Sequence, residues 1–409
     1  MKKSLLFLLL TSFLFTPLFS QEEQEEGVLF QFKQNKGDST SHVSEVIEEA
    51  YFNGYLNNQT QFINRMTTTI EEELQEGAAK LKTTYMTTQN SLVNGYNEYL
   101  TWGEESTVHI NRSKNGQLYN SDTEDLPTVR GVPSFPNKKV RVGETWRMKG
   151  EEVHDCKELF NMDEVIRVPF TADYKYMGKY PYENSTEKYD VISVYYTFYQ
   201  SNFNNRLYKK GTFRSIEGEA AQTIYWDSNK NDLAHYEEEF QIEMFDTYGN
   251  SYYFVGQSGG EVTEYHSMNT DEQVQKIIDT VESYDLEDVT VSKGEKGLTI
   301  SLENIQFEPD SDVLLESEKI KLQKIGEILK SVSNDLLITG HCAHRGTANA
   351  RQKLSEDRAK SVAEYLVQLD VRDKKHIYTQ GKGSTMPLAS NDSEEGRRKN
   401  RRVEITIMD

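Results

Sequence analysis

The stretch that decides the fold reads Gly-His-Cys-Ala-His-Arg-Gly-Thr, residues 340–347, and it follows a short apolar run at 336–339. Around it, extended apolar segments alternate with apolar stripes of helical spacing, in the order strand, helix, strand, helix, strand. Further strands are expected at 298–307, 377–380 and 403–407, and helices at 314–332 and 354–369. This order predicts an α/β sandwich of ordinary domain size over residues 291–409.

Further strings surround this stretch in a fixed order. They are Asn-Ile-Gln-Phe at 304–307, Leu-Ser-Glu-Asp-Arg-Ala at 354–359, Gly-Lys-Gly at 381–383 and Gly-Arg-Arg-Lys-Asn-Arg-Arg-Val at 396–403. Their order and spacing resemble the OmpA-like C-terminal domain shared by outer-membrane protein A and peptidoglycan-associated lipoprotein, over about residues 298–408. The resemblance implies a βαβαβ domain that binds the stem peptide of peptidoglycan non-covalently through its diaminopimelate residue.

The resemblance also implies which side chains would meet that ligand. A zwitterion needs a cation for its carboxylate and an anion for its ammonium group. The family's cation maps onto Arg358, and the family loop and final corner map onto His341, Asn400 and Arg401. The family's acid maps onto Ala343, so one half of the expected clamp is missing.

Two hypotheses follow from Ala343. Either Asp357 or Glu356 takes over the ammonium group, or the domain keeps the fold and has lost its usual ligand. Loss of one partner of a desolvated charge pair weakens binding by about two decades or more. The family also often places an asparagine at the position of Arg351, so a second ligand-side residue differs.

Other chemical interpretations of the sequence are weaker. His341, Cys342 and His344 lack a fourth metal ligand, and we expect neither metal nor cofactor. The basic run at 397–402 fits the family's final corner, and a net charge of −20 repels nucleic acid. The neighbours at 154–156, His-Asp-Cys, do not indicate catalysis, because catalytic Cys and His are neighbours in space and seldom in sequence. We therefore expect no enzyme.

Length and composition set wider limits. The chain has 409 residues and a mean hydropathy of −0.72, which predicts two or three foldable domains and excludes a polytopic helical membrane protein. Cys156 and Cys342 are the only cysteines, and they are expected to be unpaired and buried. Residues 1–20 have the basic start and apolar core of a signal peptide, so we expect export to the periplasm, the outer membrane or the cell wall.

Residues 21–267 are expected to be a β-rich antiparallel region. Asn53-Gly54 indicates a hairpin after a strand at 42–51, and a strand at 189–199 has an apolar and a polar face. More strands are expected at 28–32, 165–176, 211–216, 221–226, 236–245 and 251–255. The proline-rich segment at 126–140 is either a sub-boundary or a crossing within one sheet. Residues 142–146 and 169–170 make the region weakly similar to soluble curved-sheet envelope domains. Acidic residues within the expected strands favour a soluble domain over membrane-spanning strands, which need an apolar outer face.

Residues 268–290 are expected to be a helical linker, with an amphipathic helix at 270–284. The predicted fold class is α+β multidomain: a β-rich antiparallel region followed by the OmpA-like sandwich. The expected function is non-covalent association with peptidoglycan, which would tether the β-rich region near the cell wall. The alternative is a divergent interaction module that has lost peptidoglycan, whose aromatic β-region recruits an envelope protein or an apolar ligand.

Overall fold

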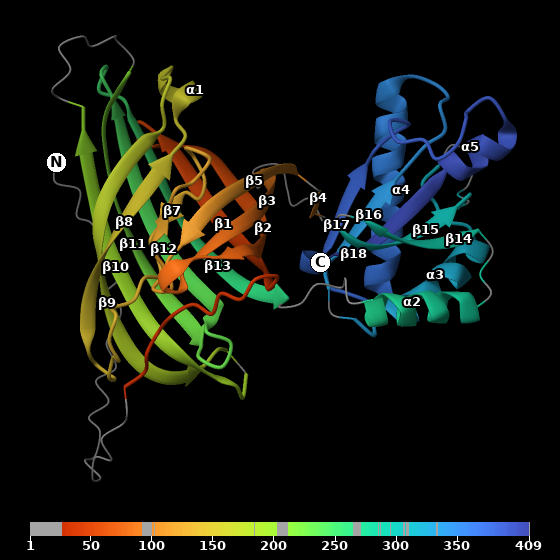
Figure 1. The fold of residues 1–409 in the computed structure, drawn as a ribbon. Coiled ribbons are helices and arrows are strands. Elements are labelled where there is room, and N and C mark those ends of the chain that lie inside the picture. The colour runs from red at the N-terminus through yellow and green to blue at the C-terminus, as the bar shows by residue number, and fades with distance from the viewer. Residues whose placement is uncertain are drawn as a thin grey trace.

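The computed structural model describes residues 27–91, 100–101, 103–183, 185–202, 212–264, 271–284, 286, 288–294, 296–305, 307, 311–332 and 334–408. These residues form a large curved β-sheet from the N-terminal part of the chain and a smaller α/β body from the C-terminal part (Figure 1). The expected signal peptide at 1–20 lies outside the described residues. None of the helices in the described ranges has the length and apolar character needed to cross a bilayer.

The N-terminal sheet contains twelve strands in the order β6-β5-β3-β2-β1-β13-β12-β11-β10-β9-β8-β7. Neighbouring strands are antiparallel throughout. The strands are β1 (Ser39–Phe52), β2 (Tyr55–Glu73), β3 (Ala79–Ser91), β5 (Glu104–Arg112), β6 (Leu118–Tyr119), β7 (Val129–Arg130), β8 (Thr145–His154), β9 (Ile166–Pro181), β10 (Lys188–Ser201), β11 (Phe213–Asp227), β12 (Asp232–Asp246) and β13 (Ser251–Glu264), with a short helix α1 (Lys157–Phe160) before β9.

The hairpin at Asn53-Gly54 is confirmed, since both residues have positive φ and join β1 to β2. The two faces of β10 also match their prediction: Ile192, Val194, Tyr196 and Phe198 are buried while the alternate side chains are exposed. A strand of this kind covers a core on one side only.

Two strand predictions are corrected. Residues 211–216 and 221–226 were expected to be separate strands, but β11 runs unbroken from Phe213 to Asp227. Gly218 lies in its middle because a Cβ there would come within 2.5 Å of the Phe198 ring, so this glycine serves close packing and not a turn. The expected strand at 28–32 is reduced to one bridge between Val28 and Val140.

An aromatic core fills the inner face of the N-terminal sheet. Phe135 lies 4.8 Å from Trp226 and 5.4 Å from Phe30, measured between ring centroids. Phe135 belongs to the proline-rich segment at 126–140, and β7 within that segment pairs with β8. The segment therefore completes one sheet and its core, and the structure shows no second β-domain among the described residues 27–264.

The C-terminal body has a six-stranded sheet in the order β14-β15-β18-β16-β17-β4. Its elements are α2 (Asp271–Ser283), β14 (Val289–Gly294), β15 (Gly297–Glu303), α3 (Glu316–Leu329), β16 (Leu336–Gly340), α4 (Ala348–Gln368), β17 (Ile377–Gly381), α5 (Glu394–Asn400) and β18 (Arg402–Met408). Helix α2 matches the predicted amphipathic helix, and its Ile277 and Val281 are buried in the same core as α3 and α4. This helix thus packs on the C-terminal body and not on the N-terminal sheet.

The two bodies share a strand and an apolar contact. Strand β4 (Leu100–Thr101) comes from the N-terminal part of the chain and pairs in parallel with β17, which covers the edge of the C-terminal sheet. Beside it, buried apolar side chains of the two bodies pack together; they are Val43, Ile63 and Met86 on one side and Leu337, Tyr378 and Met408 on the other.

A buried ion pair lies within this contact. Arg65 Nε of β2 donates to Asp335 Oδ2 at 3.0 Å, and His376 Nδ1 lies 2.7 Å from Asp335 Oδ1. The Asp335 side chain has no exposed surface, and 8% of the Arg65 side chain is exposed. A carboxylate buried this completely requires cationic partners, so Arg65 is a requirement of the docked arrangement.

Removing Arg65 alone should destabilise the chain strongly. Loss of one member of a buried pair costs about 3–5 kcal/mol, so we expect Arg65→Met to lower the free energy of unfolding by about 3 kcal/mol. The double variant Arg65→Met/Asp335→Leu should lose less than the two single variants together, as measured by urea unfolding. Glu105→Gln, which removes a half-exposed pair with Lys296, is the control and should cost under about 1 kcal/mol. Additive losses from the two single variants would contradict this account.

The docked arrangement should weaken as the pH rises. The hydrogen bond with Asp335 raises the pKa of His376 above its ordinary value of 6.5, against the opposing effect of burial, and Asp373 and Glu261 add to the rise. A raised folded-state pKa stabilises the fold below about pH 6.5, and that stabilisation is lost as the pH passes through the raised value. The free energy of unfolding should decline over this window in the wild type and decline less in His376→Gln. Equal slopes for the two proteins would refute the assignment.

Candidate functional site

The loop at 341–347 is positioned by close contact between β16 and α4. Gly340 ends β16, and a Cβ there would lie 2.0 Å from the Ser355 carbonyl oxygen of α4, so only glycine fits. Ser355 is fully buried and its Oγ accepts a hydrogen bond from the Gly383 amide at 2.9 Å. These contacts hold the strand, the helix and the loop at 381–383 together at one end of the sheet.

His341 is buried and faces the sheet. Its Nε2 lies 3.2 Å from Glu404 Oε2 of β18, and Arg402 Nε donates to the other carboxylate oxygen of Glu404 at 2.7 Å. Burial alone would raise the pKa of Glu404, but the contacts with His341 and Arg402 lower it to about 2. Burial lowers the pKa of His341. The imidazole therefore fixes the loop to β18, and only 3% of the residue is exposed to solvent.

Arg358 lies on α4, half-buried beside the segment that follows β15. Its guanidinium carbon is 4.7 Å from the centre of the Phe307 ring, and Nε donates to the Ser311 carbonyl oxygen at 3.4 Å. The neighbouring ring and the carbonyl orient the planar guanidinium, which suits two-point capture of a carboxylate.

A second arginine accompanies Arg358. Arg351 lies two helical turns earlier on the same face of α4, and its Nη1 donates to the Gly346 carbonyl oxygen of the loop. Cys342 lies against α4, with its Sγ 3.6 Å from the Arg351 carbonyl oxygen. Burial raises the pKa of its thiol, while the positive charges of Arg358 and Arg351 oppose that rise. Cys342 is free and buried, as is Cys156, which confirms the expectation for both cysteines.

Ala343 places a methyl group where the family's acid was expected, and only 9% of the residue is exposed. Of the two acids expected to compensate, Glu356 is exposed and accepts a hydrogen bond from Gln352 at 2.7 Å, and Asp357 is half-buried. The site formed by the loop and α4 is therefore mainly cationic, with the exposed Arg345 adding to Arg351 and Arg358.

The final corner supports the loop from the other side. Asn400 is buried; its Oδ1 accepts from the amides of Leu388 and Ala389 at 2.7 and 3.0 Å, and its Nδ2 donates to Asn391 Oδ1 at 3.1 Å. Asn391 Oδ1 also accepts from the His344 amide at 3.0 Å, which joins the corner to the loop.

Arg401 lies outside this network. Its Nη2 donates to Glu394 Oε1 at 2.8 Å, and this bond together with that from Arg397 lowers the pKa of Glu394. The structure thus brings His341, Ala343 and Asn400 into one connected loop system, with Arg358 on the adjacent helix and Arg401 in a separate surface pair.

A model of the OmpA family matches residues 306–401 of this chain. The C-terminal domain belongs to the OmpA family. The match begins after β15 and leaves the N-terminal sheet outside it.

Curated relatives match the same domain. "Outer membrane protein A" of Bordetella avium is 39% identical over 25% of this chain and 53% of its own length. "Peptidoglycan-binding protein ArfA" of Mycobacterium bovis is 39% identical over 25% of this chain and 32% of its own length. This chain thus spans about half or less of the length of these relatives. Among solved structures, an outer membrane protein from Borrelia burgdorferi B31 is 35% identical, with 30% of this chain and 97% of that chain covered and a TM-score of 0.26.

Several supporting residues of the OmpA domain were not found from the sequence. Glu404 acts through contacts that join distant segments, and no local pattern marks it. Asn391 belongs to the strings that resemble the family, but its bonds to the His344 amide and to Asn400 could not be foreseen. Ser355 was quoted within the helix string, but its bond to Gly383 could not be foreseen. Within the described ranges, no group of three or more His, Cys, Asp or Glu side chains has a geometry suited to a metal ion.

The contrast between Asn400 and Arg401 can be tested. Asn400→Ala leaves the Leu388 and Ala389 amides without their acceptor, and each unsatisfied buried group costs about 1–3 kcal/mol. We expect a loss of at least about 2 kcal/mol in the free energy of unfolding. Arg401→Ala removes an exposed pair and should cost under about 1 kcal/mol. Urea unfolding of both variants checks this, and similar losses would show that the corner network is misassigned.

Proposed function

We propose that this chain is an exported cell-envelope protein that binds peptidoglycan non-covalently through its OmpA domain and holds its β-rich body beside the cell wall. The observation that carries the proposal is the contact of Arg358 with Phe307 and Ser311, because the family resemblance assigns the ligand carboxylate to this arginine and these contacts orient its guanidinium. Support comes from the match to the OmpA family and from a relative whose name states that it binds peptidoglycan.

In this proposal the ligand carboxylate lies against Arg358, with Arg351 as a second cation at the mouth of the loop. Two arginines on one helix face favour a ligand region with more than one carboxylate or carbonyl oxygen. The roles of His341 and Asn400 are then to hold the loop and the corner, since His341 is buried 3.2 Å from Glu404 and Asn400 is buried in hydrogen bonds to the domain itself. Arg401 supports the surface beside them through Glu394.

Ala343 favours a second candidate function, in which the domain no longer reads the stem peptide and acts as an interaction module. The methyl group offers no charge to an ammonium ion, and the nearby carboxylates at 356 and 357 lie on α4 and not in the loop. The two candidates differ in whether the cationic half of the site is sufficient to bind the stem peptide without an acid in the loop. Neither requires a catalytic group, and we propose no enzymatic activity.

Co-sedimentation of the full chain with purified peptidoglycan sacculi separates the two candidates. Wild type should pellet with sacculi, and Arg358→Ala should reduce the bound fraction at least about tenfold, because a charge-assisted carboxylate contact is removed. Arg398→Ala removes an exposed arginine that pairs with Asp288 elsewhere on the domain and should bind as wild type does.

Ala343→Asp should bind more tightly than wild type if the site is a weakened form of the family's clamp. If wild type and Arg358→Ala stay in the supernatant and only Ala343→Asp pellets, the interaction-module candidate stands and the peptidoglycan proposal fails. Circular dichroism of each variant confirms that the fold is retained.

A further inference from the structure

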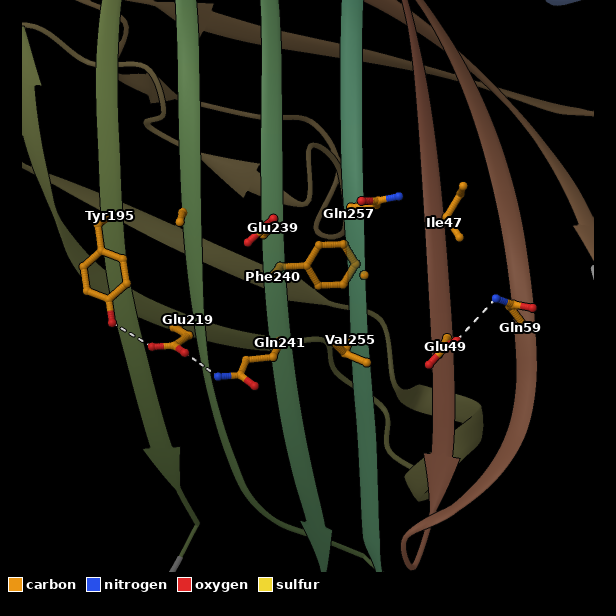
Figure 2. Close-up of a pocket in the computed structure, with 12 residues that line it drawn as sticks. Ile47, Glu49, Gln59, Tyr195, Glu219, Glu239, Phe240, Gln241, Val255 and Gln257 are labelled. Carbon is orange, nitrogen blue, oxygen red and sulfur yellow. Dashed lines mark hydrogen bonds between the residues drawn. The ribbon is translucent and has the colours of Figure 1, made fainter. Parts of the chain in front are cut away.

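A hollow, acidic surface lies on the outer face of the N-terminal sheet, away from the loop at 341–347 that belongs to the proposed peptidoglycan site (the OmpA ligand loop). One part has a volume of about 700 Å³ and is lined by residues of β1, β2 and β10–β13 (Figure 2). A second part of about 970 Å³ shares five of these lining residues and continues to Asp373 and His376 of the C-terminal body. We call the two parts together the acidic groove. Its carboxylates include Glu45, Glu49, Glu219, Glu237, Glu239 and Glu261.

The strand register sets the spacing of these acids. Glu45 of β1 and Glu237 of β12 both lie opposite Gly259 of β13, so one strand separates them. Two strand spacings amount to about 10 Å, and acids two residues apart along a strand are about 7 Å apart. A single metal ion binds its oxygens at about 2.3–2.6 Å and cannot bridge such distances. The spacing instead suits separate cationic groups carried along one molecule.

The described lining of the groove contains only one basic side chain, His376, and Glu261 Oε2 lies 3.7 Å from Nδ1 of the adjacent His235. Among the described residues that line it, none is a lysine or an arginine, and His376 is engaged with Asp335. Glu219 accepts from Tyr195 at 2.7 Å and also from Gln241, as Figure 2 shows. Within the described part of the chain, Glu237 and Glu239 make no side-chain hydrogen bond or ion pair, and both are exposed. Like charges on adjacent positions of a sheet face repel each other. Because the fold does not neutralise these carboxylates, a cationic partner would reduce their electrostatic repulsion.

Gly259 gives an independent indication of a ligand. A glycine inside a strand weakens it and marks a bulge, a tight bend or a place where a ligand or another backbone comes close. No register shift is present at Gly259, and a Cβ there would meet only the Tyr236 carbonyl oxygen, at an ordinary 3.7 Å. The fold itself therefore does not need glycine here. Its absent side chain leaves the floor of the groove open between Glu45 and Glu237.

We propose that the acidic groove binds an extended, lysine- or arginine-rich polypeptide segment of another protein. Its cationic side chains would lie between the carboxylate rows, and the exposed ring of Tyr195 would face them from β10. This proposal is independent of peptidoglycan binding, because no residue of the groove belongs to the OmpA ligand loop or to α4.

The test uses the full chain and a synthetic octalysine peptide, with affinity measured by isothermal titration calorimetry at low and at physiological salt. Gly259→Leu fills the groove without altering charge and should weaken binding at least about tenfold. Thr171→Leu places the same side chain on an exposed position of β9, four strands from β13, and should leave the affinity unchanged. Glu237→Gln/Glu239→Gln should weaken binding and reduce its salt dependence.

Equal affinities for wild type and Gly259→Leu would overturn the proposal, because the attraction would then come from the net charge of the whole chain. Absence of saturable binding to wild type would overturn it as well. Sedimentation velocity adds a further check: a dimer that Gly259→Leu disrupts would show that a second copy of this chain occupies the groove and not a separate basic partner.

Discussion

The structure depends on how one buried carboxylate is neutralised. Asp335 lies just before β16, and its side chain has no exposed surface. It pairs with Arg65 of the N-terminal sheet and with His376 of the C-terminal body. Without Arg65 the docked arrangement would leave a poorly compensated buried charge, which costs far more than an open surface would. The pair therefore specifies which face of the OmpA domain meets which strand of the sheet. The apolar contact around Leu337 and Tyr378 buries apolar surface between the two bodies and so stabilises this docked arrangement.

This contact links the function proposed for the C-terminal domain to the N-terminal sheet. Strand β16 is five residues long. Asp335, directly before it, and Leu337, near its start, meet the N-terminal sheet, and Gly340 at its end leads into the loop at 341–347. A domain attached to the cell wall by its loop would thus hold the β-rich body in a defined orientation. The acidic groove borders the same contact through Asp373 and His376, so it would face a partner at a fixed position relative to the wall.

Much of the fold could be predicted because local patterns carried it. Alternation of polar and apolar residues gave β10, the Asn53-Gly54 turn gave the first hairpin, and the ordered strings gave the OmpA domain. The unbroken course of β11 was not predictable, because the close packing of Gly218 against the Phe198 ring involves a neighbouring strand and leaves no local pattern in the sequence. The roles within the site were less predictable. Asn400 and His341 fit the family pattern, yet the hydrogen bond of Asn400 with the Leu388 amide and the contact of His341 with Glu404 depend on segments that only the fold brings together.

The OmpA domain and the β-rich body form one unit that the Arg65–Asp335 contact holds together. The most direct measurement is a pulsed electron paramagnetic resonance distance between spin labels at Lys175→Cys on β9 and Lys353→Cys on α4, two exposed positions on the two bodies. The account predicts one narrow distance distribution for this labelled chain and a clearly broader one when Arg65→Met is added. A broad distribution in the chain that keeps Arg65 would contradict it, because the two bodies would then move independently.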